Sequence, residues 1–220
     1  MIRIGWFSTA RGATSRALLA AAVEAIRDGR VDAEIAYVFC SREDGESPET
    51  DQFLAQVRGY GLPLVTKSFE AARTAAGAKG MGFARSGFAP WREAYDADIA
   101  DLLAPYHADV ALQAGYMLVW SPGLCERIHA INLHPAAPGG PAGTWQQVIW
   151  QLIDQRAAGS GVYMHQVTPS LDQGPVVTYC RYPLDTAEFG DAWAAIGDRT
   201  SEDLKATEGE ALPLFNLIRA

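Results

Sequence analysis

The sequence is poor in cysteine and has no long apolar run, and these two absences argue against several classes of protein. Its three cysteines, Cys40, Cys125 and Cys180, are odd in number and far apart. A disulfide framework or a zinc ribbon needs closer, paired spacing, so we expect buried thiols in a reducing cytoplasm. No apolar stretch approaches the ~20 residues that cross a bilayer, and no signal peptide is visible. We therefore expect a cytoplasmic protein without a membrane segment.

Dense basic segments and the common nucleophile motifs are also missing. The net charge is −8 and no block of Lys and Arg occurs, so nucleic acid is not an expected partner. No Gly-x-Ser-x-Gly occurs and no cysteine stands beside a histidine, which argues against nucleophilic catalysis. Small molecules are the expected partners, and we expect a monomer or a homodimer.

What the sequence does contain is a regular alternation of strand-forming and helix-forming segments. The expected strands are 2–7, 34–40, 62–66, 110–114, 130–133, 162–167 and 176–181. The expected helices are 16–27, 48–59, 91–104, 122–127, 145–155 and most of 200–219. Residues 67–89 are small and rich in glycine, and we expect a mobile surface loop there.

This alternation predicts an α/β fold with a doubly wound, mostly parallel sheet flanked by helices. The length of 220 residues suits one large domain, 1–220, or two closely packed halves. Ligands of such sheets bind beyond the carboxyl ends of the strands. We therefore expect residues 8–15, 115–117 and 132–134 to meet in one crevice.

Small residues follow the first strand, in Ser8-Thr9-Ala10-Arg11-Gly12-Ala13-Thr14-Ser15. Backbone N–H groups at the start of the next helix, together with the helix dipole, can bind a phosphate. The segment lacks the spacing of a dinucleotide-binding loop and the ending of a P-loop. A tight turn capped by Thr14 or Ser15 is an equally good interpretation.

The strongest chemical pattern is Asn132-Leu133-His134-Pro135, followed later in the chain by Asp172. Asn132 and His134 are two residues apart, so on a strand their side chains point to the same side. Together they can hold a carbonyl group and stabilise the oxyanion that forms when it is attacked. Asp172 can orient the imidazole and favour its charged form.

Two other interpretations of these residues stay open at this stage. A histidine at the end of an apolar strand is often structural. His134, His165 and Asp172 can also be read as metal ligands, but their spacing fits no familiar zinc pattern, and we expect no metal.

Around this pattern the chain resembles the folate-dependent formyltransferases, most closely the small purine-biosynthesis enzymes that act on glycinamide ribonucleotide. The segments that carry the resemblance are Arg92-Glu93-Ala94-Tyr95-Asp96, Ala114-Gly115-Tyr116-Met117, Ser121-Pro122, Asn132-Leu133-His134-Pro135, Gly161-Val162-Tyr163-Met164-His165 and Leu171-Asp172-Gln173-Gly174-Pro175. They occur in the family's order and are strongest over residues 90–182. The resemblance implies a Rossmann-like sheet whose first half, 1–112, binds the phosphate of the acceptor and whose second half, 113–220, binds 10-formyltetrahydrofolate.

The resemblance also implies roles for individual residues. The residues that fall on the family's catalytic trio are Asn132, His134 and Asp172. The residues that fall on its substrate-binding positions are Gly12, Ala13, Thr14 and, less directly, Glu208. The residues that fall on folate-contacting positions are Arg92, Met117, Leu118, Val119 and His165, the last of which we expect to orient a water molecule.

Several segments depart from the family's pattern. The phosphate loop usually reads Gly-Asn-Gly-Ser-Asn, but here it is Ala10-Arg11-Gly12-Ala13-Thr14. Leu118 stands where a basic residue is usual, and residues 74–89 look like an insertion. The expected function is formyl transfer from 10-formyltetrahydrofolate to the amine of glycinamide ribonucleotide. The alternatives are a formyltransferase for another amine such as an amino sugar, a formyl-folate hydrolase, and a non-catalytic folate- or nucleotide-binding module.

Overall fold

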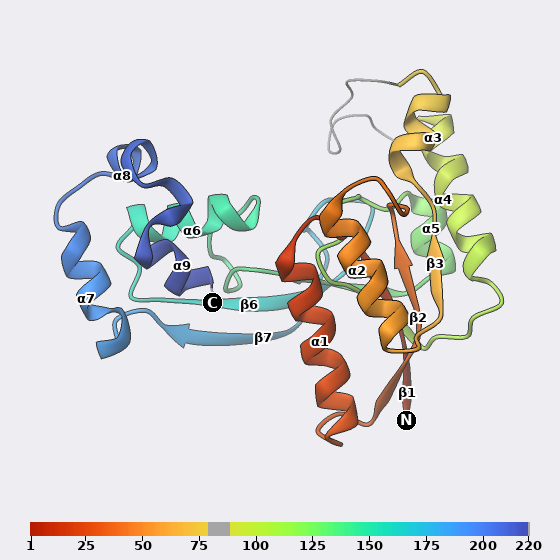
Figure 1. Cartoon of the computed structure of the whole chain (residues 1–220), viewed down its shortest axis with the longest axis horizontal. Coiled ribbons are helices and arrows are strands. Elements are labelled where there is room, and N and C mark those ends of the chain that lie inside the picture. The colour runs from red at the N-terminus through yellow and green to blue at the C-terminus, as the bar shows by residue number, and fades with distance from the viewer. Residues whose placement is uncertain (79–88, 220) are drawn as a thin grey trace. The chain divides into compact units, whose positions relative to one another are not determined.

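The computed structural model describes residues 1–78 and 89–219 and has an α/β fold (Figure 1). The strands are β1 (Ile2–Ser8), β2 (Ala33–Cys40), β3 (Leu64–Thr66), β4 (Val110–Gln113), β5 (Ala130–His134), β6 (Gly159–Gln166) and β7 (Val176–Pro183). The helices are α1 (Ala13–Arg27), α2 (Pro48–Gly59), α3 (Phe69–Ala75), α4 (Pro90–Leu103), α5 (Pro122–Arg127), α6 (Trp145–Asp154), α7 (Ala187–Ile196), α8 (Ser201–Thr207), the 3-10 helix η1 (Gly209–Ala211) and α9 (Pro213–Arg219).

The strands of the described residues form one seven-stranded sheet in the order β3-β2-β1-β4-β5-β6-β7. The pairs β1–β2, β1–β4, β2–β3 and β4–β5 are parallel. β6 and β7 run antiparallel, because Gln166 N donates to Pro175 O at 2.9 Å and Leu184 N donates to Ala158 O at 2.8 Å. The predicted doubly wound, mostly parallel sheet is confirmed.

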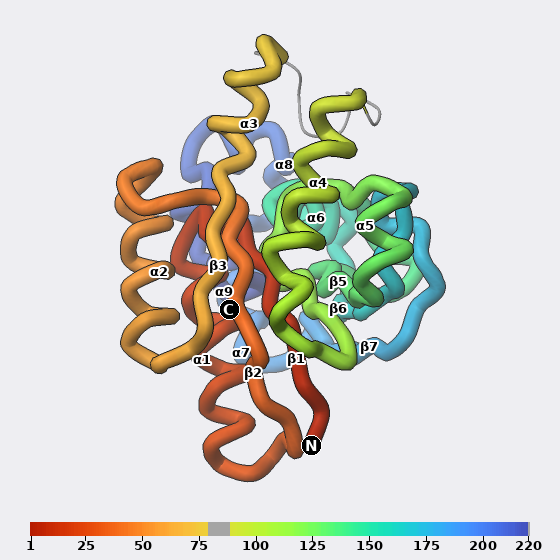
Figure 2. Tube along the Cα trace, turned by 90° about the vertical axis from the view of Figure 1, so that its right-hand side faces the viewer, coloured from red at the N-terminus to blue at the C-terminus, as the bar shows by residue number. Residues whose placement is uncertain are grey.

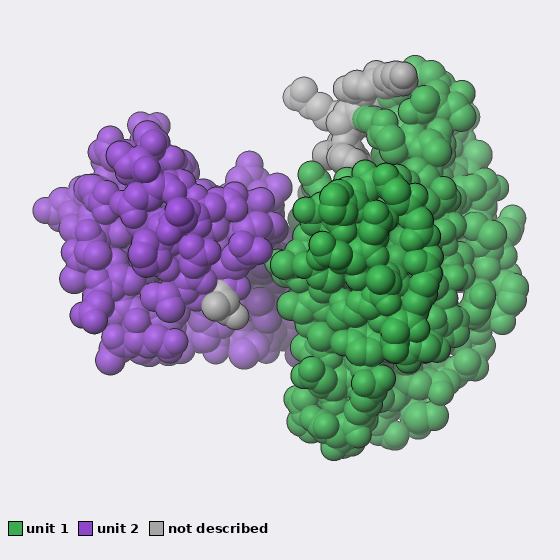
Figure 3. Space-filling view, viewed as in Figure 1, with its two compact units in different colours: residues 1–133, 165–175 green, residues 134–164, 176–220 purple. Residues whose placement is uncertain are grey.

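The chain forms two compact units, which Figure 3 colours separately. Unit 1 comprises residues 1–133 and 165–175, and unit 2 comprises residues 134–164 and 176–220. Segment 165–175 belongs to unit 1, where Val167 N donates to Ala130 O at 2.8 Å. These units differ in extent from the predicted halves, 1–112 and 113–220, whose separate functions stay a prediction.

Unit 1 has helices on both faces of its strands (Figure 2). Trp6 of β1 is buried in a cluster with Leu19 of α1 and Leu54 of α2. Phe7, the next residue, is buried in a second cluster with Ile99 of α4. Successive side chains of a strand point to opposite faces, so β1 is a central strand covered on both sides.

Unit 2 buries its apolar side chains among helices α6 to α9. Helix α6 begins with a capping box, in which Thr144 Oγ1 accepts from Gln147 N at 3.3 Å and Thr144 N donates to Gln147 Oε1 at 2.8 Å. This reciprocal pair satisfies two N–H groups that the helix itself leaves without partners. The apolar face of α6 contacts α9, and the ring centroids of Trp150 and Phe215 lie 5.0 Å apart.

Two helices were not predicted from the sequence. Helix α3 occupies Phe69–Ala75, where we predicted a loop, and Ser68 caps it by accepting from Ala71 N at 3.0 Å. Helix α7 occupies Ala187–Ile196, where we predicted no element. For the predicted loop over 67–89, the prediction is therefore wrong at its start, and residues 79–88 lie outside the described part of the chain.

The thiols only partly match their predicted burial. All three cysteines are free, and Cys40 is buried, Cys125 is partly buried and Cys180 is exposed. The prediction of a buried thiol is therefore wrong for Cys180, which lies on β7. Burial raises the pKa of the Cys40 thiol to about 12 and that of Cys125 to about 11. Within residues 1–78 and 89–219, no helix is both long enough and apolar enough to cross a membrane.

Candidate active site

The strand order changes direction between β1 and β4, which is the point where open α/β sheets bind ligands. β1 and β4 are parallel neighbours in which Phe7 lies beside Gln113, so both strands end at the same edge. We call the segments that follow them the β1–α1 loop (residues 9–12) and the β4–α5 loop (residues 114–121). β5 lies on the other side of β4, with Asn132 beside Gln113.

Buried hydroxyl groups hold the β1–α1 loop. Ser8 Oγ accepts from Ala10 N at 3.1 Å, and Thr50 Oγ1 donates to Ala10 O at 3.2 Å. Ala10 is fully buried and has a φ of +53°, a left-handed conformation that is unfavourable for a residue with a Cβ. Strain of this kind persists only where surrounding contacts fix the backbone, as the two hydroxyls do here.

Helix α1 begins at Ala13 without a side-chain cap, and such a cap was one of the two interpretations of this segment. Its N-cap is Gly12, and among the described residues no side chain caps the helix and no acidic residue lies in its first turn. Thr14 and Ser15 are inside the helix, so the prediction that one of them caps it is wrong. Ser15 N donates to Gly12 O at 3.2 Å within the first turn. The positive end of the helix dipole lies at Gly12 and Ala13, next to the exposed Arg11.

The first half of the β4–α5 loop is attached to the residue that follows β1. Thr9 Oγ1 accepts from Met117 N at 2.9 Å, and Thr9 N donates to Gly115 O at 3.1 Å. Thr9 Oγ1 also accepts from Ser41 Oγ at 3.2 Å, so its hydroxyl joins three chain segments. Gly115 has a φ of +71°, and a Cβ there would lie 3.1 Å from Ser15 Oγ, which explains the glycine at this crossing.

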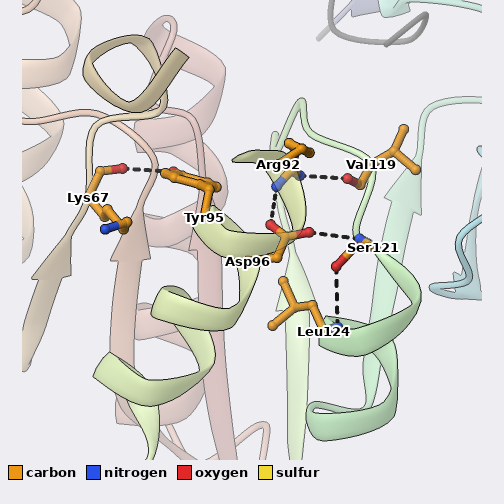
Figure 4. A network of polar contacts seen from close by, with 7 residues as sticks. All are labelled: Lys67, Arg92, Tyr95, Asp96, Val119, Ser121 and Leu124. Atoms are coloured by element: carbon orange, nitrogen blue, oxygen red, sulfur yellow. Dashed lines mark hydrogen bonds and ion pairs between the residues drawn. The ribbon is translucent and has the colours of Figure 1, made fainter. Parts of the chain in front are cut away.

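The second half of the β4–α5 loop is attached to helix α4 (Figure 4). Arg92 Nη2 donates to Val119 O at 2.7 Å, and Ser121 N donates to Asp96 Oδ2 at 2.7 Å. Arg92 and Asp96 form an ion pair one helical turn apart, and their side chains are only 5% and 0% exposed. An irregular loop is thus fixed by a buried pair of charges that satisfy its backbone groups.

These contacts place the residues that the resemblance assigns to folate. The guanidinium of Arg92 is bound inside unit 1, so the structure gives it a role in holding the loop, and its direct contact with a ligand stays a prediction. Met117 is exposed, Leu118 is buried in the core cluster around Phe7, and Val119 is partly buried. Met117 is therefore the most accessible of these three loop residues.

Asn132, His165 and Asp172 lie together in unit 1. Asn132 Nδ2 lies 3.1 Å from His165 Nε2, and His165 Nε2 lies 3.4 Å from Asp172 Oδ1. His165 Nδ1 lies 3.0 Å from the backbone oxygen of Gln166, which can only accept, so Nδ1 carries a proton. Nε2 thus lies between a donor, the Asn132 amide, and an acceptor, the Asp172 carboxylate. A neutral ring accepts from Asn132 through Nε2, whereas a charged ring donates to Asp172.

The turn that carries Asp172 approaches His165 closely. Asp172 has a φ of +53°, a left-handed conformation that Asp tolerates better than most residues. A Cβ added to Gly174 would collide with the backbone oxygen of Gln166 and would lie 3.3 Å from His165 Nδ1. The glycine therefore allows the turn to lie against His165, and the turn in turn sets the position of Asp172.

The other two predicted site residues lie in unit 2. His134 is buried, and its ring centroid lies 4.9 Å from that of Tyr163. Glu208 ends helix α8 and accepts from Arg199 Nη1 at 2.7 Å. Among the described residues, no group of three or more His, Cys, Asp or Glu side chains gathers in a way that suits a metal ion.

Sequence reasoning did not identify Thr9, Asp96 or Gln113. Asp96 follows Arg92 by four residues on an expected helix, a spacing that indicates an ion pair. Thr9 forms a hydrogen bond with Met117, which is 108 positions away, and no local sequence pattern predicts such a contact. Gln113 is buried at the end of β4 with no acceptor for its Nε2 among the described residues, and its polarity within an apolar strand was the available signal.

Comparison with solved structures finds the same fold. Glycinamide ribonucleotide transformylase 1 from Symbiobacterium toebii is 25% identical with a TM-score of 0.62, covering 98% of this chain and 87% of that one. The enzyme of the same name from Geobacillus kaustophilus is 21% identical with a TM-score of 0.63, covering 99% of each chain. A formyltetrahydrofolate deformylase from Pseudomonas syringae pv. tomato is 18% identical with a TM-score of 0.60, covering 99% of this chain and 59% of that one.

Comparison of the sequence with known proteins also finds formyltransferases. Phosphoribosylglycinamide formyltransferase of Escherichia coli K12 is 29% identical over 103 residues, which are 46% of this chain and 47% of the relative. The match thus spans about half the length of that relative. The sequence model described as "Formyl transferase" matches residues 12–202, which is most of the chain and includes Asn132, His134 and Asp172. The chain belongs to the formyl transferase family.

Proposed function

We propose that this protein transfers the formyl group of 10-formyltetrahydrofolate to the primary amine of glycinamide ribonucleotide. The observation that carries the proposal is the linked set Asn132, His165 and Asp172, at 3.1 and 3.4 Å, within a formyl transferase match over residues 12–202. Formyl transfer between two nitrogen atoms requires an oxyanion to be stabilised and a proton to be moved, and these side chains can do both.

In the proposed reaction the acceptor amine attacks the formyl carbon, and negative charge develops on the formyl oxygen. The Asn132 amide keeps one N–H free of His165 because Nδ2 has two hydrogens, and that N–H can donate to the oxygen. The imidazole of His134, which the resemblance assigns to the catalytic trio, is the second proposed donor. Each donor to such an oxyanion is commonly worth about 3–4 kcal/mol of transition-state stabilisation.

The proton balance of the reaction assigns a role to Asp172. The attacking amine must lose a proton, and the folate nitrogen that leaves must gain one as its bond to the formyl carbon breaks. A carboxylate that is 31% exposed and lies 3.4 Å from an imidazole nitrogen can accept a proton from the amine side and return it. The His165 ring lies between this carboxylate and the Asn132 amide and can bind one or the other, according to its protonation. The folate itself carries the one-carbon unit, so no metal is required.

A phosphorylated acceptor suits the start of α1. The start of α1 at Gly12 and Ala13 has no side-chain cap and a positive dipole end, and the exposed Arg11 adds a positive charge; Thr14 follows in the first turn. A helix that lacks both a side-chain cap and an acid in its first turn is compatible with an anion at that position. This is the argument for glycinamide ribonucleotide over an acceptor amine without a phosphate.

The test is an assay of the purified protein with 10-formyl-folate and glycinamide ribonucleotide, followed through the absorbance of the folate. We expect turnover that depends on the amine, and a loss of about 100- to 1000-fold in kcat for His134→Ala and for Asp172→Asn. The matched control is His107→Ala, because His107 is exposed and lies outside the proposed site, and its kcat should not change.

Other outcomes of the same assay select other functions. Formate release in water alone, at the same rate with and without the amine, would identify a formyl-folate hydrolase. Transfer only to other amines, such as an amino sugar, would leave the reaction standing and replace the acceptor. If both substrates bind but neither reaction occurs, the protein is a binding module and the catalytic assignments are wrong.

A further inference from the structure

The two loops that the proposed function assigns to different substrates meet at one side chain. The β1–α1 loop leads to the uncapped start of α1, where we place the phosphate of the acceptor. The β4–α5 loop carries Met117, which we place against the folate. Thr9 is the first residue after β1, and it bonds through both its backbone and its hydroxyl to the β4–α5 loop.

The contacts of Thr9 are buried and close. Thr9 is 3% exposed, its Oγ1 accepts from Met117 N at 2.9 Å, and its N–H donates to Gly115 O at 3.1 Å. Ser41 Oγ, at the end of β2, donates to the same hydroxyl at 3.2 Å. Because Met117 N has no strand or helix partner, the Thr9 hydroxyl is what fixes the backbone at the exposed residue of the loop.

The far half of the β4–α5 loop is fixed independently. Arg92 and Asp96 hold Val119 O and Ser121 N from helix α4, and both side chains are almost completely buried (Figure 4). The two halves of the loop therefore have separate attachments, Met117 to Thr9 and residues 119 and 121 to helix α4. The course of the loop at Met117 thus depends on the β1–α1 loop.

In the chain, Thr9 is followed by the segment that leads to the start of α1, where we place the phosphate of the acceptor. Ala10 follows Thr9 with a left-handed φ of +53°, and Ser8 and Thr50 hold its N–H and its carbonyl oxygen. In the proposed function the acceptor's phosphate lies at the first turn of α1, a few residues beyond this point, and would restrain the same short, strained segment. Ordering of this segment reaches Met117 through the Thr9 hydroxyl.

We infer that Thr9 is a positioning residue that couples the two substrate sites, so that occupancy of the phosphate position tightens the binding of folate. The inference rests on the proposed function, because it takes its two ligands from there. Coupling between two sites is reciprocal: whatever factor phosphate gives to folate binding, folate gives to phosphate binding. Thr9 needs no contact with either ligand to have this effect.

The test measures the dissociation constant of tetrahydrofolate with and without saturating inorganic phosphate, which stands in for the phosphate of the acceptor. For the wild-type protein we expect phosphate to tighten folate binding about fivefold. Thr9→Val keeps the shape of the side chain and removes the hydroxyl, so the factor should fall to about one. Thr9→Ser restores the hydroxyl and should restore the factor.

Thr50→Val is the matched control, because Thr50 holds Ala10 from helix α2 and does not bond to the β4–α5 loop. It should weaken phosphate binding while leaving the coupling factor at saturating phosphate near the wild-type value. In turnover, Thr9→Val should raise the KM of both substrates, whereas Thr50→Val should raise the KM of the acceptor alone. A loss of general stability would affect both variants alike and would not produce this split.

The outcomes separate the inference from the proposed function. If the wild-type protein binds tetrahydrofolate and phosphate with no coupling, or if Thr9→Val keeps the full coupling factor, the inference is overturned and the proposed function stands. If the wild-type protein binds no tetrahydrofolate, the proposed function is overturned and the inference falls with it. Loss of coupling in Thr9→Val, with recovery in Thr9→Ser, supports the inference.

Discussion

The two loops at the strand ends are held by different chemistry. The β1–α1 loop is held by neutral hydroxyl groups, from Ser8 and Thr50, that bond to the backbone of Ala10. The far half of the β4–α5 loop is held by a buried ion pair, Arg92 with Asp96. A neutral hydrogen bond contributes about 0.5–1.5 kcal/mol, whereas breaking a buried ion pair by removing one partner costs about 3–5 kcal/mol. Breaking one contact of the first loop should therefore cost less stability than breaking the ion pair that holds the second.

The largest expected effect comes from breaking the ion pair. Arg92→Met leaves the Asp96 carboxylate buried without its partner and leaves Val119 O without its donor, so the free energy of unfolding should fall by about 3–5 kcal/mol. Urea unfolding measures it. The double variant Arg92→Met with Asp96→Leu removes both charges and should recover most of the loss. A loss below about 1 kcal/mol in the single variant would contradict the comparison.

A smaller effect is expected where the two loops cross. Gly115→Ala forces a Cβ into a left-handed backbone conformation at a distance of 3.1 Å from Ser15 Oγ. We expect a loss of about 1–3 kcal/mol in the free energy of unfolding. The control is Gly123→Ala within α5, where a Cβ meets nothing within 4 Å and where alanine should be neutral or stabilising. Equal effects at both positions would show that the crossing imposes no constraint.

Gln113 offers a change of opposite sign at the end of β4. Its side chain is buried, and its Nε2 has no acceptor among residues 1–78 and 89–219. Gln113→Leu removes a desolvated amide and keeps a similar volume, so the free energy of unfolding should rise by about 1 kcal/mol. Thermal unfolding measures this change in the free energy of unfolding. Urea unfolding should give the same m-value for the variant and the wild-type protein. If the variant is destabilised instead, the amide has a partner that supports the fold.

The smallest expected effect tests the open start of α1. Gly12→Asp adds a carboxylate at the N-cap, where φ is −178° and a Cβ meets nothing within 4 Å. The cap and its charge should stabilise the free protein by about 0.5–1 kcal/mol. The same carboxylate occupies the N–H groups that we assign to phosphate, so the KM of the acceptor should rise. Improved stability with an unchanged KM of the acceptor would show that the phosphate does not bind at this position.

Much of the fold followed from local signals in the sequence. The helix expected over 48–59 is confirmed as α2, and Ser47 Oγ accepts from Thr50 N at 3.2 Å as its cap. The alternation of strands and helices predicted the mostly parallel sheet. Helix α7 was missed because Gly190 interrupts a short segment of mixed polarity, and packing of Ile196 in unit 2 stabilises a helix there that local propensity does not indicate.

The candidate site was predicted in part. The motif around Asn132 and Asp172 predicted a site that handles a carbonyl group, and this chemistry stays a prediction. The structure adds that His165 Nε2 lies within 3.1 Å of Asn132 Nδ2 and 3.4 Å of Asp172 Oδ1. The cap of α1 was predicted wrongly because Thr14 and Ser15 are good capping residues, yet the strained turn at Ala10 places the helix start at Gly12. The role of Thr9 was not predictable, since a hydrogen bond between residues 108 positions apart depends on strand order and not on local sequence.

Ala10 shows what one change in the β1–α1 loop costs the fold. Its left-handed backbone costs about 1–2 kcal/mol relative to glycine, while its fully buried methyl group returns about 0.8 kcal/mol. The net cost of alanine is then about 0.2–1.2 kcal/mol, so glycine would be slightly better for stability at this position. An exchange between these two residues keeps Thr9 on one side and Gly12 on the other. Alanine or glycine at position 10 is then a poor measure of functional change.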